Sequence, residues 1–128
     1  MEEKSLVRLA SEIKEKAYAP YSGFRVGAAV ETESGKIYTG VNIENASFGA
    51  TNCAERTAIF KAVSEGERKI KKIAVTSDSD ETVYPCGICR QVIAEFADKD
   101  TKIICSSKNG DYKVYTLDEI LPNAFKEF

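Results

Sequence analysis

The sequence predicts a single α/β domain of three layers, in which a mixed five-stranded sheet is flanked by helices. Two observations support this fold class. Short stretches of alternating apolar and polar residues indicate strands, and segments with apolar residues at helical spacing separate those strands. The length limits the number of domains. Because 128 residues bury one core of ordinary size, we expect residues 1–128 to form one domain.

The first half of the chain predicts a helix, a β-hairpin and a second helix. Apolar residues share one face of residues 6–17, with Lys and Glu opposite, which is typical of an amphipathic helix. Alternation predicts strands over 25–33 and 37–41, joined by a tight Ser-Gly turn. Small and aliphatic residues at helical spacing then predict a buried helix over 53–65, with Gly66 as its stop.

The second half of the chain predicts a strand–helix–strand unit followed by a hairpin. The turn of this hairpin is Asn109-Gly110, the strongest short-range hairpin signal in the chain. Helices between strands also indicate crossover connections, which are right-handed. The expected elements are a strand over 72–77, a helix over 86–97, strands over 102–107 and 112–116, and a brief helix over 117–121.

Charge and composition narrow the class of function. Lys and Arg total 18 against 20 Asp and Glu, a formal net charge of -2, so no positive field is available to hold a nucleic acid. The apolar runs are short and the N-terminus carries no export pattern, so we expect no membrane partner and a cytoplasmic location. The chain contains no histidine, so its chemistry must use Cys, Asp, Glu, Lys or Tyr.

Three of the four cysteines stand at the starts of two predicted helices. Cys53 opens one helix, and Cys86 and Cys89 form a Cys-x-x-Cys turn that opens the other. The positive end of a helix dipole lowers thiol pKa values, and three thiolates suit zinc. Because structural zinc sites normally have four protein ligands, three indicate a catalytic site open to water. Glu55 is then the expected proton shuttle, and Cys105 is better explained as a small core residue.

Simpler interpretations stay open for each of these residues. A Cys-x-x-Cys alone could be a redox pair, Glu55 could cap its helix together with Asn52, and Arg56 could be a solvated helix charge. However, Cys-Ala-Glu and Pro-Cys-x-x-Cys occur together in this chain. Independent structural roles would not require that pairing, so it favours a catalytic site.

The combined motifs resemble those of zinc deaminases, in which a ligand, one residue and a glutamate are followed by Pro-Cys-x-x-Cys. In particular, the chain resembles the cytidine deaminase family, of the short homotetrameric type. The absence of histidine agrees with the all-cysteine branch, which is typical of enzymes that act on free nucleosides. The resemblance covers nearly the whole chain, through residues 18–29, 40–47, 52–58 and 85–92.

The resemblance implies a zinc-dependent enzyme of pyrimidine salvage. It would hydrolyse cytidine and 2′-deoxycytidine to uridine and 2′-deoxyuridine with release of ammonia. Cys53, Cys86 and Cys89 would bind one Zn²⁺ per subunit. Glu55 would pass the proton of the water to ring N3 and then to the departing amine, and Arg56 would donate hydrogen bonds to the ligand sulfurs.

The resemblance also implies which residues bind the nucleoside. Asn42 and Glu44 would hold the ribose hydroxyls, although by themselves they could be ordinary polar positions after a strand. The backbone at Ala54 would orient the base. Phe125 would complete the pocket of a neighbouring subunit in a homotetramer. The residues expected to bind substrate are Phe24, Asn42, Ile43, Glu44, Phe48, Ala54 and Phe125.

Two residues depart from the family pattern. Phe48 stands where Tyr is common, so a contact that needs the hydroxyl is lost, and Ile88 is bulkier than the usual Ala between the paired cysteines. Two other functions stay open. One is deamination of a modified cytosine nucleoside such as blasticidin S, and the other is a non-enzymatic structural zinc module with Cys105 as the fourth ligand.

Overall fold

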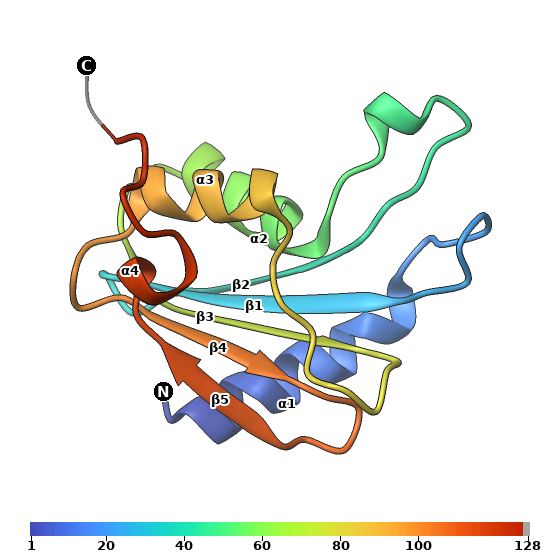
Figure 1. Cartoon of the computed structure of the whole chain (residues 1–128), viewed down its shortest axis with the longest axis horizontal. Coiled ribbons are helices and arrows are strands. Elements are labelled where there is room, and N and C mark those ends of the chain that lie inside the picture. The colour runs from blue at the N-terminus through green and yellow to red at the C-terminus, as the bar shows by residue number, and fades with distance from the viewer. Residues whose placement is uncertain (127–128) are drawn as a thin grey trace.

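The computed structural model describes residues 1–126 and contains the predicted mixed sheet of five strands (Figure 1). The strand order is β2-β1-β3-β4-β5. Strands β3 and β4 are parallel, and the other neighbouring pairs are antiparallel. The strands are β1 (Val26–Thr32), β2 (Ile37–Val41), β3 (Ile70–Ser77), β4 (Lys102–Ser106) and β5 (Tyr112–Tyr115).

Helices cover both faces of this sheet, so the three-layer prediction is confirmed. Figure 1 shows one helix, α1, on one face and α2 and α3 on the other. Among residues 1–126, no helix has both the length and the apolar character that crossing a membrane requires. The helices are α1 (Glu3–Ile13), α2 (Ala54–Ser64), α3 (Gly87–Phe96) and α4 (Leu117–Ile120), with short 3₁₀ turns η1 (Lys14–Lys16) and η2 (Phe48–Ala50).

The alternation in β1 divides the core into two parts. Ala28 and Val30 face α2 and α3, whereas Ala29 between them faces α1. Successive side chains of a strand point to opposite faces, so one small apolar strand can serve both layers. Cys105 is buried in the cluster on the α2 and α3 side, as predicted for a core residue.

Two glycines let helices approach the sheet closely. A Cβ on Gly40 in β2 would lie 2.4 Å from the backbone nitrogen of Ala58 in α2. On the other face, a Cβ on Gly27 in β1 would lie 2.1 Å from the carbonyl oxygen of Ala10 in α1. Both distances are far below van der Waals contact, so only glycine permits this packing. Gly40 thereby fixes the position of α2, whose N-cap is Cys53 and whose first turn carries Glu55.

The predicted elements are confirmed, with shifts at their ends and one wrong expectation. The first helix passes into η1, and β3 begins at Ile70 rather than at residue 72. The sequence pattern placed every Lys of the first helix on the solvent side, but Lys14 is only 5% exposed. Its stem lies beside Gly27, which has no side chain to exclude it, and its ammonium group reaches the carbonyl oxygen of Ser77 at 3.2 Å.

Candidate active site

The three cysteines of the two motifs lie together where α2 and α3 begin. Cys53 is the N-cap of α2, Cys86 is the N-cap of α3, and Cys89 lies in the first turn of α3. Their Sγ atoms all lie within 4.8 Å of one another, and those of Cys53 and Cys86 are 3.7 Å apart. Two sulfurs at about 2.3 Å from a tetrahedral zinc ion are separated by roughly 3.8 Å. The cluster therefore fits zinc.

The thiols of this cluster have strongly perturbed proton affinities. Hydrogen bonds from Cys89 and then from Arg56 lower the pKa of Cys53 to about 5, against the opposing effect of burial. The same interaction with Cys53, together with burial, raises the pKa of Cys89. The first thiolate thus forms readily at Cys53 and is stabilised by its neighbours. Three thiolates side by side would repel one another, so a bound cation would be needed to hold them together.

Arg56 supplies positive charge to the sulfurs. Its guanidinium donates to the Sγ of Cys53 at 3.4 Å, and this hydrogen bond raises the pKa of Arg56. The Nε of Arg56 is buried and has no hydrogen-bond partner among residues 1–126. Burial of a donor without an acceptor is costly in stability. The attraction between the guanidinium and the Cys53 thiolate acts against this cost. The interpretation of Arg56 as a solvated helix charge is therefore wrong.

Glu55 lies in the first turn of α2 and is only 4% exposed. Burial raises the pKa of its carboxyl group to about 7, and the nearby Cys53 charge adds to this effect. The capping interpretation does not hold, because Cys53 is the N-cap and no side chain caps this helix end. The side-chain amide of Asn52 donates instead to the Oγ1 of Thr57 at 3.0 Å. The carboxyl group is thus available to the site.

A cavity of about 210 Å³ opens beside the thiols and Glu55. It brings together β1, the residues after β2, the start of α2 and the segment before α3. Sequence reasoning identified some of its lining residues but missed Val26, Thr51, Asn52, Val83 and Tyr84 as site residues. The lining residues are Phe24, Val26, Asn42, Thr51, Asn52, Cys53, Ala54, Glu55, Val83, Tyr84 and Cys86.

Asn42 lines this cavity and also ties its wall together. Its Oδ1 accepts from the backbone N–H of Val26 at 2.9 Å, and its Nδ2 donates to the carbonyl oxygen of Phe24 at 2.8 Å. These bonds leave one amide hydrogen and one oxygen lone pair for a ligand. Asn42 therefore holds the cavity wall in place and can still form hydrogen bonds with the hydroxyl groups of a ligand.

Glu44 lies in an adjoining cavity of about 250 Å³, which shares Thr51 with the first and includes Tyr21 and Phe48. One carboxylate oxygen accepts from the backbone N–H groups of Tyr21 and Ser22 at 2.9 and 3.1 Å. The other accepts from the Ser22 hydroxyl at 2.5 Å, and the bonds from Ser22 are the main reason why the pKa of Glu44 is lowered. Glu44 is thus ionised and mostly committed to one loop.

The remaining residues expected to bind substrate, Ile43, Phe48 and Phe125, are not among those that line the cavity beside the thiols. Phe48 is 78% exposed and Phe125 is 62% exposed, and the side chain of Ile43 is exposed as well. The backbone of Ile43 exchanges two hydrogen bonds of 2.9 Å with Asn52, which joins the segment after β2 to the one before α2. The carbonyl oxygen of Phe125 accepts from the Gln91 amide at 2.6 Å. Both aromatic side chains are therefore accessible to a neighbouring molecule.

Tyr84, which no sequence pattern singled out, is held by a partner on the edge strand. Its hydroxyl lies 3.2 Å from that of Tyr115 in β5, and the two rings meet edge to face at 5.8 Å between centroids. A contact between segments 31 residues apart depends on the strand order, so local patterns could not identify it.

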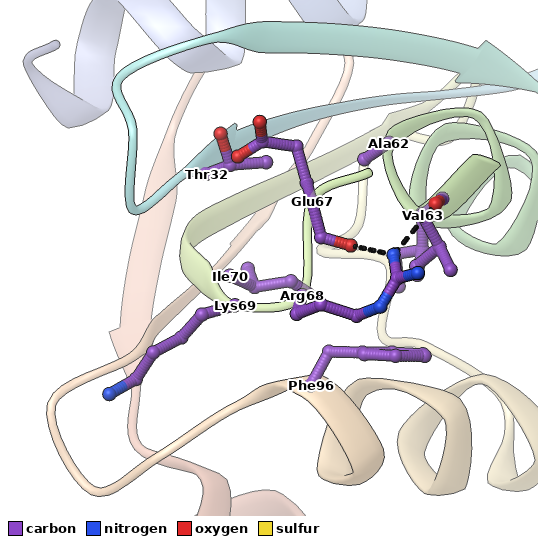
Figure 2. Close-up of a pocket in the computed structure, with 9 residues that line it drawn as sticks. Thr32, Ala62, Val63, Glu67, Arg68, Lys69, Ile70 and Phe96 are labelled. Atoms are coloured by element: carbon purple, nitrogen blue, oxygen red, sulfur yellow. Dashed lines mark hydrogen bonds between the residues drawn. The ribbon is translucent and has the colours of Figure 1, made fainter. Parts of the chain in front are cut away.

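Another cavity lies near the C-terminal end of α2 and is unrelated to this site (Figure 2). Its volume is about 10 Å³, enough for roughly one water molecule. Figure 2 shows Arg68 donating to the carbonyl oxygens of Val63 and Glu67, at 2.9 and 2.8 Å. These bonds satisfy carbonyl groups at the helix end. The cavity is a packing gap beside a helix cap and cannot hold a nucleoside.

Known proteins resemble this chain in sequence and in fold. A family model described as the cytidine and deoxycytidylate deaminase zinc-binding region matches residues 1–105. A cytidine deaminase of Halalkalibacterium halodurans is 50% identical over 125 residues, which cover 98% of this chain and 95% of the relative. A cytidine deaminase of Sporosarcina psychrophila is 47% identical over 127 residues, with coverage of 99% and 93%. The crystal structure of cytidine deaminase from Burkholderia pseudomallei has a TM-score of 0.93 at 43% identity, covering 98% of this chain and all of that one (100%).

Proposed function

Because the chain belongs to the cytidine and deoxycytidylate deaminase family, we propose that it hydrolyses free cytidine and 2′-deoxycytidine to uridine and 2′-deoxyuridine with release of ammonia. The observation that carries this proposal is the juxtaposition of three thiols with the buried carboxyl group of Glu55 beside one open cavity. The product would enter pyrimidine salvage.

Cys53, Cys86 and Cys89 would hold one Zn²⁺ per subunit. When bound, the metal acts as a Lewis acid that lowers the pKa of a water molecule towards neutrality. Arg56 and the N-termini of α2 and α3 would moderate the negative charge of the three thiolates. This moderation matters because excess negative charge would weaken the acidity that the metal confers.

Glu55 would move the protons of the reaction. A carboxyl group with a pKa near 7 can accept a proton from the attacking water and then donate it at neutral pH. Glu55 would pass the first proton of the water to ring N3 as the C4–O bond forms. It would then pass the proton of the new C4 hydroxyl group to the amine as the C4–N bond breaks. Ammonia then leaves, and the pyrimidine retains the new oxygen.

The other expected residues would orient the nucleoside. Asn42 and Glu44 would bind ribose hydroxyls with the valences that their internal hydrogen bonds leave open. Ala54 begins α2, where backbone N–H groups have no intrahelical acceptor, and would orient the base. Phe24 would contact the nucleoside from the wall, and Ile43 and Phe48 would contact it as well.

A homotetramer would complete this pocket, with Phe125 contributed to a neighbouring subunit. The exposed apolar side chains of Phe48 and Phe125 support this assembly, because exposed apolar patches mark interaction surfaces. We place residues 1–128 in a single domain with the two-part core described above. The four free cysteines suit the reducing cytoplasm, and the net charge of -2 argues against nucleic acid as substrate.

The geometry and the relatives count against both alternatives. Among residues 1–126, the cluster that could hold a metal comprises three cysteines, and Cys105 is buried elsewhere in β4. A structural site closed by Cys105 therefore lacks its fourth ligand. Relatives at 50% and 47% identity are named cytidine deaminase, which favours cytidine over blasticidin S.

Removal of zinc should abolish turnover. We expect the zinc-loaded protein to release one ammonia for each cytidine consumed, measured by ammonia assay and by the loss of cytidine absorbance. Chelation should stop the reaction and added Zn²⁺ should restore it, because the thiols alone supply no Lewis acid. Blasticidin S serves as the competing substrate. Absence of cytidine turnover in the zinc-loaded protein would disprove the proposal.

Replacement of Cys105 by Ser separates the enzyme from a structural zinc module. We expect Cys105→Ser to keep one zinc per chain, with Cys86→Ser as the matched variant that loses it. Burial raises the pKa of Cys105 to about 12, so this thiol resists becoming a ligand. Metal content measured by mass spectrometry decides the matter, and loss of zinc from Cys105→Ser would favour the structural module.

A further inference from the structure

Arg25 lies between two residues that line the nucleoside cavity, Phe24 and Val26, although its own side chain points elsewhere. Its backbone and side chain both bind Asp78, which follows β3. The carboxylate of Asp78 accepts from the Nε of Arg25 at 2.9 Å and from a terminal nitrogen at 3.1 Å. The backbones of the two residues also join, because the N–H of Asp78 donates to the carbonyl oxygen of Arg25 at 3.2 Å.

Asp78 is in turn held by the buried Lys14. The ammonium group of Lys14 lies 3.2 Å from a carboxylate oxygen of Asp78 and 3.2 Å from the carbonyl oxygen of Ser77. Hydrogen bonds from Arg25, followed by those from Lys14, lower the pKa of Asp78 to about 2. The carboxylate is therefore ionised at neutral pH and joins η1, the end of β3 and the residue before β1.

On the opposite side of the same segment, Asn42 holds the two neighbours of Arg25. It accepts from the N–H of Val26 and donates to the carbonyl oxygen of Phe24, as described above. The cavity wall is thus fixed from two directions, by Asn42 within the pocket and by Asp78 outside it. Just before this double attachment, Gly23 has a φ of 68°, a conformation that glycine adopts without strain.

We propose that Arg25, anchored by Asp78 and Lys14, is a positioning residue that fixes the Phe24–Val26 wall and thereby sets the affinity for the nucleoside. This inference rests on the proposed function. Arg25 does not reach the thiols or Glu55, so it acts on binding rather than on bond breaking. If loss of its side chain leaves the wall correctly placed only about a tenth of the time, apparent affinity falls about tenfold.

The test compares three variants by steady-state kinetics with cytidine. Arg25→Ala should raise KM about tenfold while kcat stays within about twofold, since only the population of the competent pocket changes. Arg25→Lys should recover part of the loss, because it keeps a charge near Asp78 but not the two-nitrogen geometry. Glu15→Gln is the matched control: it removes only the outer ion pair of 2.7 Å with Arg25 and should leave KM unchanged.

Amide hydrogen exchange and zinc content complete the test. Arg25→Ala should accelerate exchange at Val26 while retaining zinc and the thermal midpoint within a few degrees. An unchanged KM in an active Arg25→Ala enzyme would overturn the inference, as would parallel losses of zinc and kcat, which indicate a general structural role. If the wild-type protein failed to turn over cytidine, the proposed function would fall. Unchanged exchange at Val26 would then overturn the positioning role separately.

Discussion

At Glu55, burial and negative charge act in the same direction on one carboxyl group. Both favour its neutral form, and its pKa is raised to about 7. A solvent-exposed carboxyl group would have a pKa near 4.3 and would be a poor proton donor at neutral pH. The location in the first turn of α2 keeps the group beside Cys53 in spite of this cost. Burial of a carboxyl group is costly, and the proposed proton transfer gives a reason for this cost.

Replacement of Glu55 by Gln should separate chemistry from metal binding. We expect Glu55→Gln to retain one zinc per chain and to lower kcat by on the order of 10²- to 10⁴-fold, because the amide cannot relay protons. The thermal midpoint should stay the same or rise, since a buried carboxyl group is removed. The measurements are the rate of cytidine turnover and the zinc content of the purified variant. Normal turnover by this variant would leave Glu55 without a catalytic role.

Residues that are close in sequence explain why the centre of the site was predictable. Cys53 and Glu55 share one helical turn, and Cys86 and Cys89 share another, so local spacing already implies proximity. Tyr84 and Val26 could not be found in this way, because their places in the cavity depend on which strands are neighbours. The hydrogen bonds from Tyr21 and Ser22 to Glu44 could not be predicted either, since the sequence does not show how the loop with Tyr21 and Ser22 approaches Glu44.

At the scale of elements, the contact between β2 and α2 positions Cys53, one of the three cysteines that could hold a metal. A Cβ on Gly40 would approach the nitrogen of Ala58 at 2.4 Å and the carbonyl oxygen of Ala54 at 2.7 Å. Both atoms belong to the helix backbone, so no side chain can rotate away. The alternating pattern predicted the strand and the helix but not this distance, because periodicity carries no information on how closely two elements pack.

Insertion of one methyl group at this contact should therefore disturb both stability and zinc binding. We expect Gly40→Ala to destabilise the fold by about 1–3 kcal/mol, since overpacking forces the backbone of α2 to shift. The thermal midpoint should fall by roughly 3–10 °C, with weaker retention of zinc. Gly49→Ala is the control, because a Cβ there meets no atom within 4 Å. Equal midpoints for the two variants, measured by calorimetry, would contradict this account.

Buried Lys14 shows a second limit on prediction at this scale. Helical periodicity assigned the lysines of the first helix to solvent, because a buried ammonium group is costly unless it is paired. Its partners, Asp78 and the carbonyl oxygen of Ser77, lie more than 60 residues away at the end of β3. The pairing could be recognised only once α1 and β3 were known to be in contact. Fold class and element order were predictable, whereas this contact was not.

For the whole molecule, the cavity beside the thiols is small for a ligand pocket. Its volume of about 210 Å³ falls below the roughly 300 Å³ at which ligand pockets usually begin. Exposed apolar side chains lie beside it, with Phe24 in its wall and Phe48 in the adjoining cavity. Phe125 is exposed on the C-terminal segment and is tied to α3 by Gln91. A second copy of the chain that covers this cavity would bury these groups and enlarge the enclosed pocket.

Subunit mixing tests whether Phe125 serves a neighbour. Phe125→Ala alone should lower kcat/KM roughly 10- to 100-fold, the equivalent of burying one Phe side chain. Glu55→Gln should be nearly inactive. Co-expression of the two variants should restore activity, because a site with intact Glu55 from one chain can receive intact Phe125 from the other. Turnover per zinc in the mixed oligomer, isolated with two different affinity tags, gives the measurement.

The outcome of mixing depends on which chain each residue serves. If Phe125 completed the pocket of its own chain, every site in the mixed oligomer would carry one defect, and activity would not exceed the mean of the two parents. A monomeric mixture would behave in the same way, so the mass of the tagged complex must be measured in parallel. Activity above that mean requires residues of two chains in one site, since neither variant contains both intact groups.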